Sequence, residues 1–97
     1  MATLRFADEL SGDLARIAIH LAASDVADLG ARLDAIVEAL QVLTRHPLIG
    51  RKVAGSRREL VIGRGGRAYV ALYHYDELDD EVVVLALRGQ REAGFGD

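Results

Sequence analysis

Several residue types that build special sites are missing or rare in this sequence. Its 97 residues include no Cys, no Trp, one Pro, two Phe and three Tyr. The lack of cysteine excludes a disulfide-stapled scaffold and any metal site made of thiolates. A chain of this length has little room for an internal cofactor cavity. We therefore expect one self-supporting domain over residues 1–97, with no bound cofactor and with its function on the surface.

Long hydrophobic runs are missing too. A membrane span needs about 18 consecutive apolar residues, and charged residues such as Asp13, Arg16 and Glu38 interrupt the apolar regions here. The first nine residues carry no basic segment followed by an apolar one, so no secretory signal is visible. We expect a cytoplasmic protein with no membrane contact.

Positive charge is in slight deficit. Twelve Lys and Arg stand against fifteen Asp and Glu, a net charge of −3, which argues against a globally basic nucleic-acid binder but permits a local basic patch. All the cations are Arg except Lys52. The three histidines, His20, His46 and His74, lack partners at metal-ligand spacing, so we expect no metal site.

Apolar periodicity predicts two helices before Pro47. Asp8 is a plausible N-cap for the first helix, and Pro47 should end the second. A short connection between them favours an antiparallel helical hairpin. Polar residues such as Asp13 and Arg16 should lie opposite the apolar stripe or near its edge. The two stripes are Phe6, Leu10, Leu14, Ile17, Ala18 and Leu21, then Leu29, Leu33, Ile36, Val37, Leu40 and Leu43.

The period becomes two after Arg58 and predicts three strands, at 58–62, 68–75 and 82–88. Glycines at 63–66 and the acidic segment 76–80 supply hairpin turns, and a fourth strand at 2–6 precedes the helices. The fold class is therefore α+β, with order β-α-α-β-β-β and a helical hairpin packed on one face of an antiparallel sheet.

Alternation along the strands predicts which side chains face the helices. We expect Val83, Leu85 and Leu87 on the helix side, with Ala86 and Arg88 on the other face. The three tyrosines, Tyr69, Tyr73 and Tyr75, share one strand face. They either form an exposed ridge or fill the core. Arg88 either serves a partner or pairs with an acid such as Glu59.

Segments spread along the whole chain resemble the RelE/ParE toxin superfamily, also called plasmid-stabilisation proteins. They are Pro47–Arg51, Arg58–Ile62, Tyr69–Tyr73, Val84–Arg88 and Gln90–Gly94. Their order and spacing together are fairly specific. The resemblance implies a type II toxin that inhibits growth and is neutralised by a cognate antitoxin. RelE-like members cleave mRNA on the ribosome, whereas ParE-like members poison DNA gyrase.

The resemblance places basic residues of RelE-like nucleases at Arg58 and Arg88. Many relatives carry His and Tyr where this chain has Gly89 and Phe95, so the familiar proton carrier and stacking phenol are missing. We therefore favour the ParE-like branch, a non-hydrolytic inhibitor that binds DNA gyrase. The alternatives are a ribosome-dependent mRNA interferase and a decayed toxin that retains only antitoxin binding.

Two surfaces follow from this interpretation. We expect target contact on the open sheet face and its rim, through Arg64, Arg67, Arg88, Arg91 and Phe95. An amphipathic antitoxin tail should lie over the helical hairpin and the sheet edge, near Ala22, Ala23, Val26 and Ala27. Contact with operator DNA should come only through the antitoxin.

Overall fold

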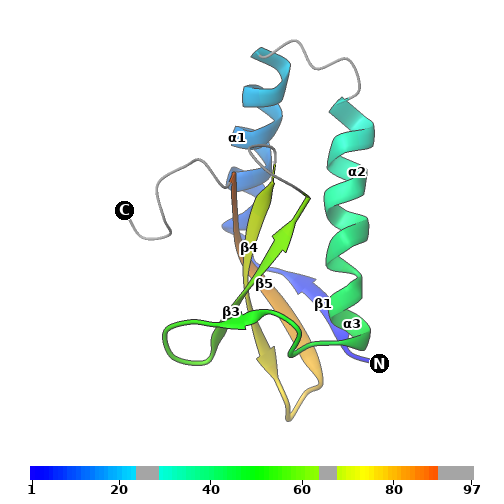
Figure 1. Cartoon of the computed structure of the whole chain (residues 1–97), viewed down its shortest axis with the longest axis vertical. Helices are drawn as coiled ribbons and strands as arrows, with labels where there is room; N and C mark the ends of the chain where they lie inside the picture. The colour runs from blue at the N-terminus through cyan, green and yellow to red at the C-terminus, as the bar shows by residue number, and fades with distance from the viewer. Residues whose placement is uncertain (24–28, 64–67, 90–97) are drawn as a thin grey trace.

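A computed structural model describes residues 1–23, 29–63 and 68–89 of the chain. Two helices lie together on one side of a twisted sheet (Figure 1). Two short elements, α3 (Val42–Arg45) and β2 (Arg51–Lys52), are added to the predicted order. Within the described ranges, no helix is long and apolar enough to cross a membrane. The elements are β1 (Thr3–Phe6), α1 (Leu10–Ala23), α2 (Leu29–Leu40), α3 (Val42–Arg45), β2 (Arg51–Lys52), β3 (Arg57–Ile62), β4 (Tyr69–Asp76) and β5 (Glu81–Gly89).

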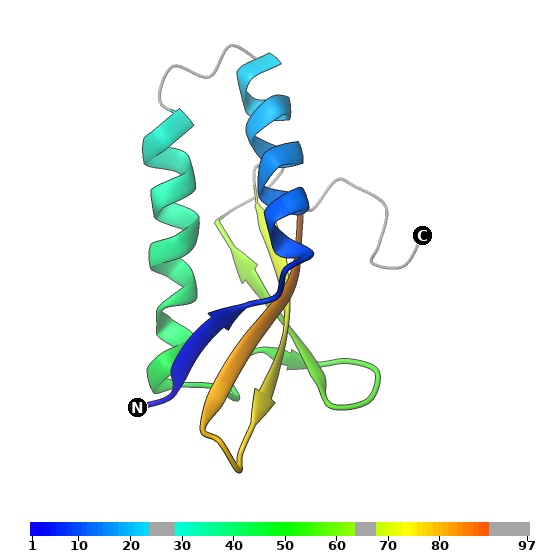
Figure 2. The same cartoon turned by 180° about the vertical axis from the view of Figure 1, so that it is seen from behind.

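The sheet has five strands in the order β1-β5-β4-β3-β2. Strands β2 to β5 are antiparallel, as their short connections require, but β1 runs parallel to β5. The expectation of a wholly antiparallel sheet was wrong at this strand. Because β1 precedes the helices and reaches β5 only through them, no tight turn imposes an antiparallel direction on the pair (Figure 2).

A β-bulge in β5 changes which side chains enter the core. Leu72 lies opposite Ala86 and Tyr73 lies opposite Val84, so Leu85 is an extra residue between them. Val82, Val84 and Leu87 are fully buried in the core cluster. The prediction for Leu87 was therefore right and those for Val83 and Leu85 were wrong. Ala86 and Arg88 follow the bulge along β5, on the same side of it as Leu87. Both therefore lie on the predicted face.

The core lies between this sheet face and the helices. The predicted stripes supply it: Leu10 and Ile17 come from α1, and Ile36 and Leu40 from α2. Tyr73 is fully buried among them, and Tyr69 and Tyr75 pack against the same cluster. The tyrosines therefore fill and line the core, and no tyrosine ridge forms on the other face.

The start of α1 differs from the prediction. The helix begins at Leu10, and Asp8 contributes its backbone carbonyl, which accepts bonds from the Ser11 N–H (3.3 Å) and the Ser11 hydroxyl (2.9 Å). The Asp8 carboxylate is thus not the cap. The end of α2 fits better, since the helix stops at Leu40 and one further turn, α3, ends just before Pro47.

Two polar side chains of α1 close the exposed edge of β5. The Leu87 N–H donates to Asp13 Oδ2 at 2.9 Å, and Arg16 Nη2 donates to the Leu87 carbonyl at 2.9 Å. Pairing with β1 stops at Val84, opposite Phe6, so this part of β5 has no neighbouring strand on that side. Asp13 and Arg16 therefore bind the backbone where a neighbouring strand would otherwise pair. The two side chains also form an ion pair, with Arg16 Nη2 3.8 Å from Asp13 Oδ1.

The loop between α3 and β2 is fixed to the core by Tyr73. The Gly50 N–H donates to the Tyr73 hydroxyl at 2.9 Å, and Arg58 Nη1 donates to the carbonyls of Leu48 (3.2 Å) and Gly50 (2.9 Å). A Cβ at Gly50 would lie 2.6 Å from Tyr73 Cε1 and 2.7 Å from the Glu59 carbonyl oxygen. Only glycine fits there because these atoms occupy the space of a side chain.

Replacing Gly50 with alanine should lower the free energy of unfolding by about 1 to 3 kcal/mol, because the added methyl overpacks the loop against Tyr73 and the β3 backbone. Gly12→Ala is the matched control. Gly12 is an exposed position of α1, and nothing lies within 4 Å of a Cβ placed there. The free energy of unfolding of that variant should therefore rise by roughly 0.5 to 1 kcal/mol. Urea unfolding of both variants measures this, and equal stability of the two would contradict it.

The Tyr73 hydroxyl gives a second prediction. Tyr73→Phe leaves the buried Gly50 N–H without its acceptor, which should cost about 1 to 3 kcal/mol near neutral pH. Burial raises the pKa of Tyr73 above its ordinary value of 10.0 and outweighs the opposing effects of Gly50 and Arg58.

The unfolded phenol ionises first, so this stabilisation is complete below about pH 10 and falls as the pH rises toward the folded pKa. The stability gap between the wild type and Tyr73→Phe should therefore stay constant up to about pH 9 and narrow as the pH rises from about 10 to about 11.5. A gap that stays constant over that range would contradict the assignment.

Removing the Asp13 carboxylate should loosen the upper part of β5. Asp13→Ala leaves the N–H of buried Leu87 without its side-chain acceptor, at a cost of about 1 to 2 kcal/mol, and should speed amide exchange at Leu87. Asp34→Ala removes an exposed acid of α2 and serves as the control. Unchanged exchange at Leu87 in Asp13→Ala would show that the edge closure has no energetic role.

Candidate functional site

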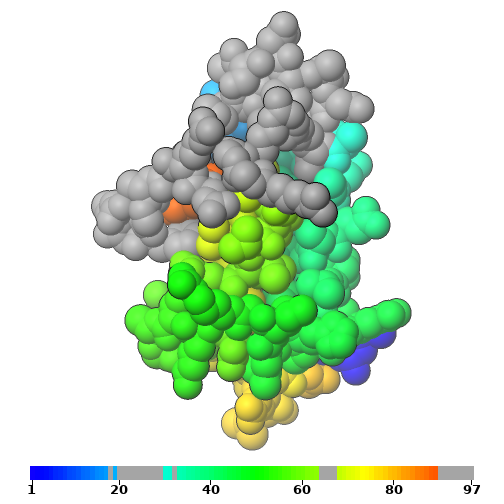
Figure 3. All heavy atoms as spheres, viewed as in Figure 1, coloured from blue at the N-terminus to red at the C-terminus, as the bar shows by residue number. Residues whose placement is uncertain are grey.

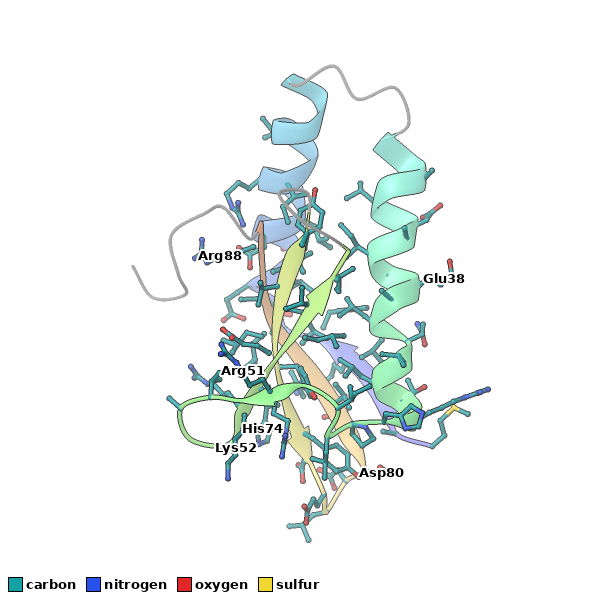
Figure 4. All side chains as sticks on the ribbon, viewed as in Figure 1. Glu38, Arg51, Lys52, His74, Asp80 and Arg88 are labelled. Carbon is teal, nitrogen blue, oxygen red and sulfur yellow. The ribbon has the colours of Figure 1, made fainter. Side chains whose placement is uncertain are left out.

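The sheet face opposite the helices carries Arg88 together with several charged residues of neighbouring strands. Cross-strand pairing puts Arg51 beside Glu59, Arg57 beside His74, and Arg88 beside Val70 on this face. Figure 4 shows Arg51 and Arg88 on the side of the sheet away from α2. We call this surface the outer face: Arg5, Arg51, Arg57, Glu59, Val61, Val70, Leu72, His74, Val83, Ala86 and Arg88.

The outer face has an apolar centre and a charged margin. Leu72 and Val83 at its centre are buried, whereas Arg51, Arg57 and Val61 at its margin are exposed. Since Leu72 and Val83 are buried already in the free chain, the side chains that can meet a partner are those of the exposed margin. Arginine is enriched at protein interfaces, so this margin is suited to contact with a macromolecule.

Two ion pairs organise the charges of the outer face. Arg51 Nη2 lies 2.8 Å from Glu59 Oε1, and Arg5 Nε lies 3.3 Å from Glu81 Oε1. Glu59 thus pairs with Arg51, the residue beside it, and not with Arg88 as one alternative had it. Arg57 has no side-chain hydrogen bond or ion pair among the residues that the structure describes. It remains available to a partner.

Of the five residues predicted to contact the target, only Arg88 lies in the described part. It is half-buried on the outer face, as predicted, with its Nε atom fully buried. The four other residues predicted for target contact lie outside the described residues, and the structure does not test them: Arg64, Arg67, Arg91 and Phe95.

Arg58 and Arg88, the pair considered for nuclease activity, do not share a face. Arg58 lies opposite Tyr73, on the helix side of the sheet, and Arg88 lies opposite Val70, on the outer face. Arg58 Nη1 is occupied by two backbone carbonyls of the preceding loop. This arginine therefore holds the loop in place.

The predicted antitoxin site is described only in part. Ala22 and Ala23 form the last residues of α1, whereas Val26 and Ala27 lie outside the described residues. Figure 1 shows the far ends of α1 and α2 extending beyond the sheet. Ile19, one turn earlier on α1, is 71% exposed. An apolar side chain of this size on a protruding helix favours contact with a partner.

A shallow groove lies where β1 leads into α1. Phe6 at its wall is 41% exposed, which is high for a phenylalanine. The groove adjoins the outermost strand of the sheet, so an extended segment can lie along both. Its lining is mostly apolar: Phe6, Ala7, Asp8, Leu10, Ser11 and Leu14.

The acidic segment between β4 and β5 is a structured turn, as predicted. Asp76 Oδ1 accepts bonds from the N–H groups of Leu78 (3.0 Å) and Asp79 (3.3 Å), and the Tyr75 hydroxyl donates to Asp80 Oδ1 at 2.6 Å. That hydrogen bond is the main reason why the pKa of Tyr75 is raised. Across the described ranges, no group of three or more metal-ligating side chains comes together.

Three features escaped the sequence analysis. The contacts of Asp13 and Arg16 with Leu87 join residues more than 70 positions apart, and no local pattern reveals them. The bond from Gly50 to Tyr73 likewise depends on the tertiary fold. The third feature was visible in the sequence: four cations fall within 51–58 with no acid among them.

Comparisons with known proteins agree with this architecture. A family model described as "ParE toxin of type II toxin-antitoxin system, parDE" matches residues 4–94. No curated protein matches the chain.

Solved structures with a similar fold include a chain of the chromosomal ParDE system of Pseudomonas aeruginosa, with a TM-score of 0.73 and 19% identity, covering 92% of this chain and 96% of that one. A chain of the RelBE2 toxin-antitoxin complex of Mycobacterium tuberculosis has a TM-score of 0.58 and 24% identity, covering 92% and 98%. A chain of the Escherichia coli RelBE complex has a TM-score of 0.63 and 13% identity, covering 95% and 100%. At these identities the structures show a shared fold.

The match of the family model over residues 4–94, together with the helical hairpin on a five-stranded sheet, shows that this chain belongs to the ParE toxin family of type II toxin-antitoxin systems.

Proposed function

We propose that this chain is a non-hydrolytic toxin that acts in the cytoplasm, binds DNA gyrase through the outer face, and is neutralised by a cognate antitoxin. Membership of the ParE family supports the toxin role and the antitoxin partner. The separation of Arg58 from Arg88 is the observation that favours inhibition by binding over RNA cleavage.

Cleavage of RNA needs a group that moves the proton of the 2′-hydroxyl and cations that stabilise the charge developing on the phosphate. Both must reach the same phosphate. Arg58 is turned to the helix side and donates to Leu48 and Gly50, so it is poorly placed to act with Arg88. The two positions where relatives carry His and Tyr are Gly89 and Phe95 here. The residues thus lack a complete nuclease set.

Inhibition by binding needs no catalytic group. A protein interface derives most of its affinity from a few arginine and aromatic anchors around a desolvated centre. Arg88, opposite Val70 on the neighbouring strand, supplies such an anchor on the outer face. We assign Arg64, Arg67, Arg91 and Phe95 to the same contact, as the sequence analysis proposed.

We assign the antitoxin to a different surface from the target. Exposed Ile19 on α1 and the apolar groove beside Phe6 support a site on the helical hairpin and the β1 edge. We assign Ala22, Ala23, Val26 and Ala27 to this site. Burying apolar side chains there would contribute about 25 cal/mol for each Å² removed from water.

The purified chain should inhibit supercoiling by DNA gyrase or trap gyrase-cleaved DNA, and it should leave translation in a cell extract unchanged. The antitoxin encoded beside it should reverse the effect. Cutting of ribosome-bound mRNA would instead establish the RelE-like alternative. A chain that binds the antitoxin but affects neither process would be a decayed toxin.

Arg88→Gln should weaken inhibition of gyrase at least tenfold, because a central arginine anchor of an interface costs about 2 kcal/mol or more when it is removed. Arg45→Gln, at the exposed end of α3, removes a cation away from the outer face and should inhibit like the wild type. Equal inhibition by both variants would remove Arg88 from the target interface. Retained antitoxin binding shows that each variant is folded.

A further inference from the structure

The densest run of positive charge in this acidic chain is one short segment, which holds four of its twelve cations. Residues 50–58 contain Arg51, Lys52, Arg57 and Arg58 and no acid, a local charge of +4. Since the whole chain carries −3, the remaining residues carry −7. The segment forms β2, a turn and the start of β3. It crosses the lower front of the molecule as a projecting hairpin, green in Figure 3. We call it the basic hairpin.

Three of these four cations reach solvent. The Arg51 side chain is 80% exposed even though it pairs with Glu59. Lys52 and Arg57 are exposed and have no side-chain hydrogen bond or ion pair with any part of the chain that the structure describes. Alternation along β2 sends Arg51 and Lys52 to opposite sides of the strand, so the cations spread around the hairpin. Only Arg58 is committed to a structural role.

The residues between the cations indicate what kind of partner the basic hairpin fits. They are small or half-buried: Val53, Ala54, Gly55 and Ser56, with Gly55 at φ 66° making the turn. None offers a large exposed apolar or aromatic anchor, which a protein interface needs at its centre. Contacts with a phosphodiester backbone need only cations, hydroxyls and backbone N–H groups.

We infer that the basic hairpin, including Arg51 and Arg57, contacts the phosphate backbone of the duplex DNA held by the topoisomerase, while the rest of the outer face, around Arg88, contacts the enzyme itself. The inference rests on the proposed gyrase target. It adds a composite partner: the toxin binds the enzyme–DNA complex more tightly than the enzyme alone.

The charge balance explains why such a contact would be weak without the enzyme. The basic hairpin attracts phosphates only within about a Debye length, roughly 10 Å at 0.1 M salt, and the acidic remainder of the chain repels them. Free duplex should therefore bind poorly. Docking on the enzyme raises the local concentration of DNA near Lys52 and Arg57, and the contact then adds to the affinity.

The test is the affinity of the full-length chain for gyrase, measured with and without a bound linear duplex at about 50 and about 200 mM KCl. At the lower salt, the wild type should bind the DNA-loaded enzyme about tenfold more tightly than the DNA-free enzyme. Each phosphate contact contributes about 0.9 to the slope of log affinity against log salt. Lys52→Gln and Arg57→Gln should each make that slope shallower by about this amount and reduce the gain from DNA.

Arg45→Gln is the matched control, since it also removes one exposed cation without a side-chain partner among the described residues, but from α3. It should keep the wild-type slope. Antitoxin binding and the thermal unfolding midpoint confirm that all three variants are folded.

Two results would overturn the inference and leave the proposed function standing. One is equal affinity of the wild type for gyrase with and without DNA. The other is an equal loss of affinity in both states for Arg57→Gln, which would assign the basic hairpin to an acidic surface of the enzyme. If the wild type binds gyrase in neither state, both the proposed function and this inference fail.

Discussion

The burial of a single sheet face under the helical hairpin is the constraint on which the other features depend. Leu10 and Ile17 of α1 and Leu40 of α2 pack against Tyr73, Val84 and their neighbours. Each such side chain contributes about 1.5 to 3 kcal/mol when it is fully buried. In the described part of the chain, α1 and α2, followed by the single turn of α3, cover one face of the five-stranded sheet. The other face therefore meets solvent or a partner, and its margin is charged.

The same constraint explains why polar side chains of α1 form hydrogen bonds with the sheet. Because β1 is only four residues long, part of β5 lacks a neighbouring strand, and Asp13 and Arg16 bind the exposed backbone at Leu87. Toward the other edge of the sheet, Tyr73 reaches from the core to Gly50 and fixes the loop that precedes β2. These bonds fix the position of α1 and of the basic hairpin relative to the sheet.

Local patterns predicted the elements well and their relations less well. Apolar periods of 3.6 and 2 located both helices and the strands from β3 to β5, because these periods directly reflect which side chains must be buried. They could not reveal the bulge at Leu85, which depends on pairing with β4, nor the direction of β1, which depends on its long connection.

The site shows the same division. Placing Arg88 on the outer face needed only alternation along one strand and was correct. Predicting that Arg58 and Arg88 lie on different faces needed the register of three strands. The partners of Arg58 lie in a loop whose path the sequence does not define. The basic hairpin was visible as a run of cations, but its free side chains Lys52 and Arg57 could be recognised only from the structure.

The central claim is that the toxin uses opposite sides of the fold for its target and its antitoxin. The natural chain has no cysteine, so single thiols can be introduced at Val61 on the outer face (56% exposed) and at Ile19 on α1 (71% exposed). The most direct measurement is the alkylation rate of Val61→Cys and Ile19→Cys in the free chain and in each complex. Gyrase should protect only the thiol at position 61, and the antitoxin only the thiol at position 19. Protection of position 19 by gyrase, with position 61 still reactive, would contradict the account.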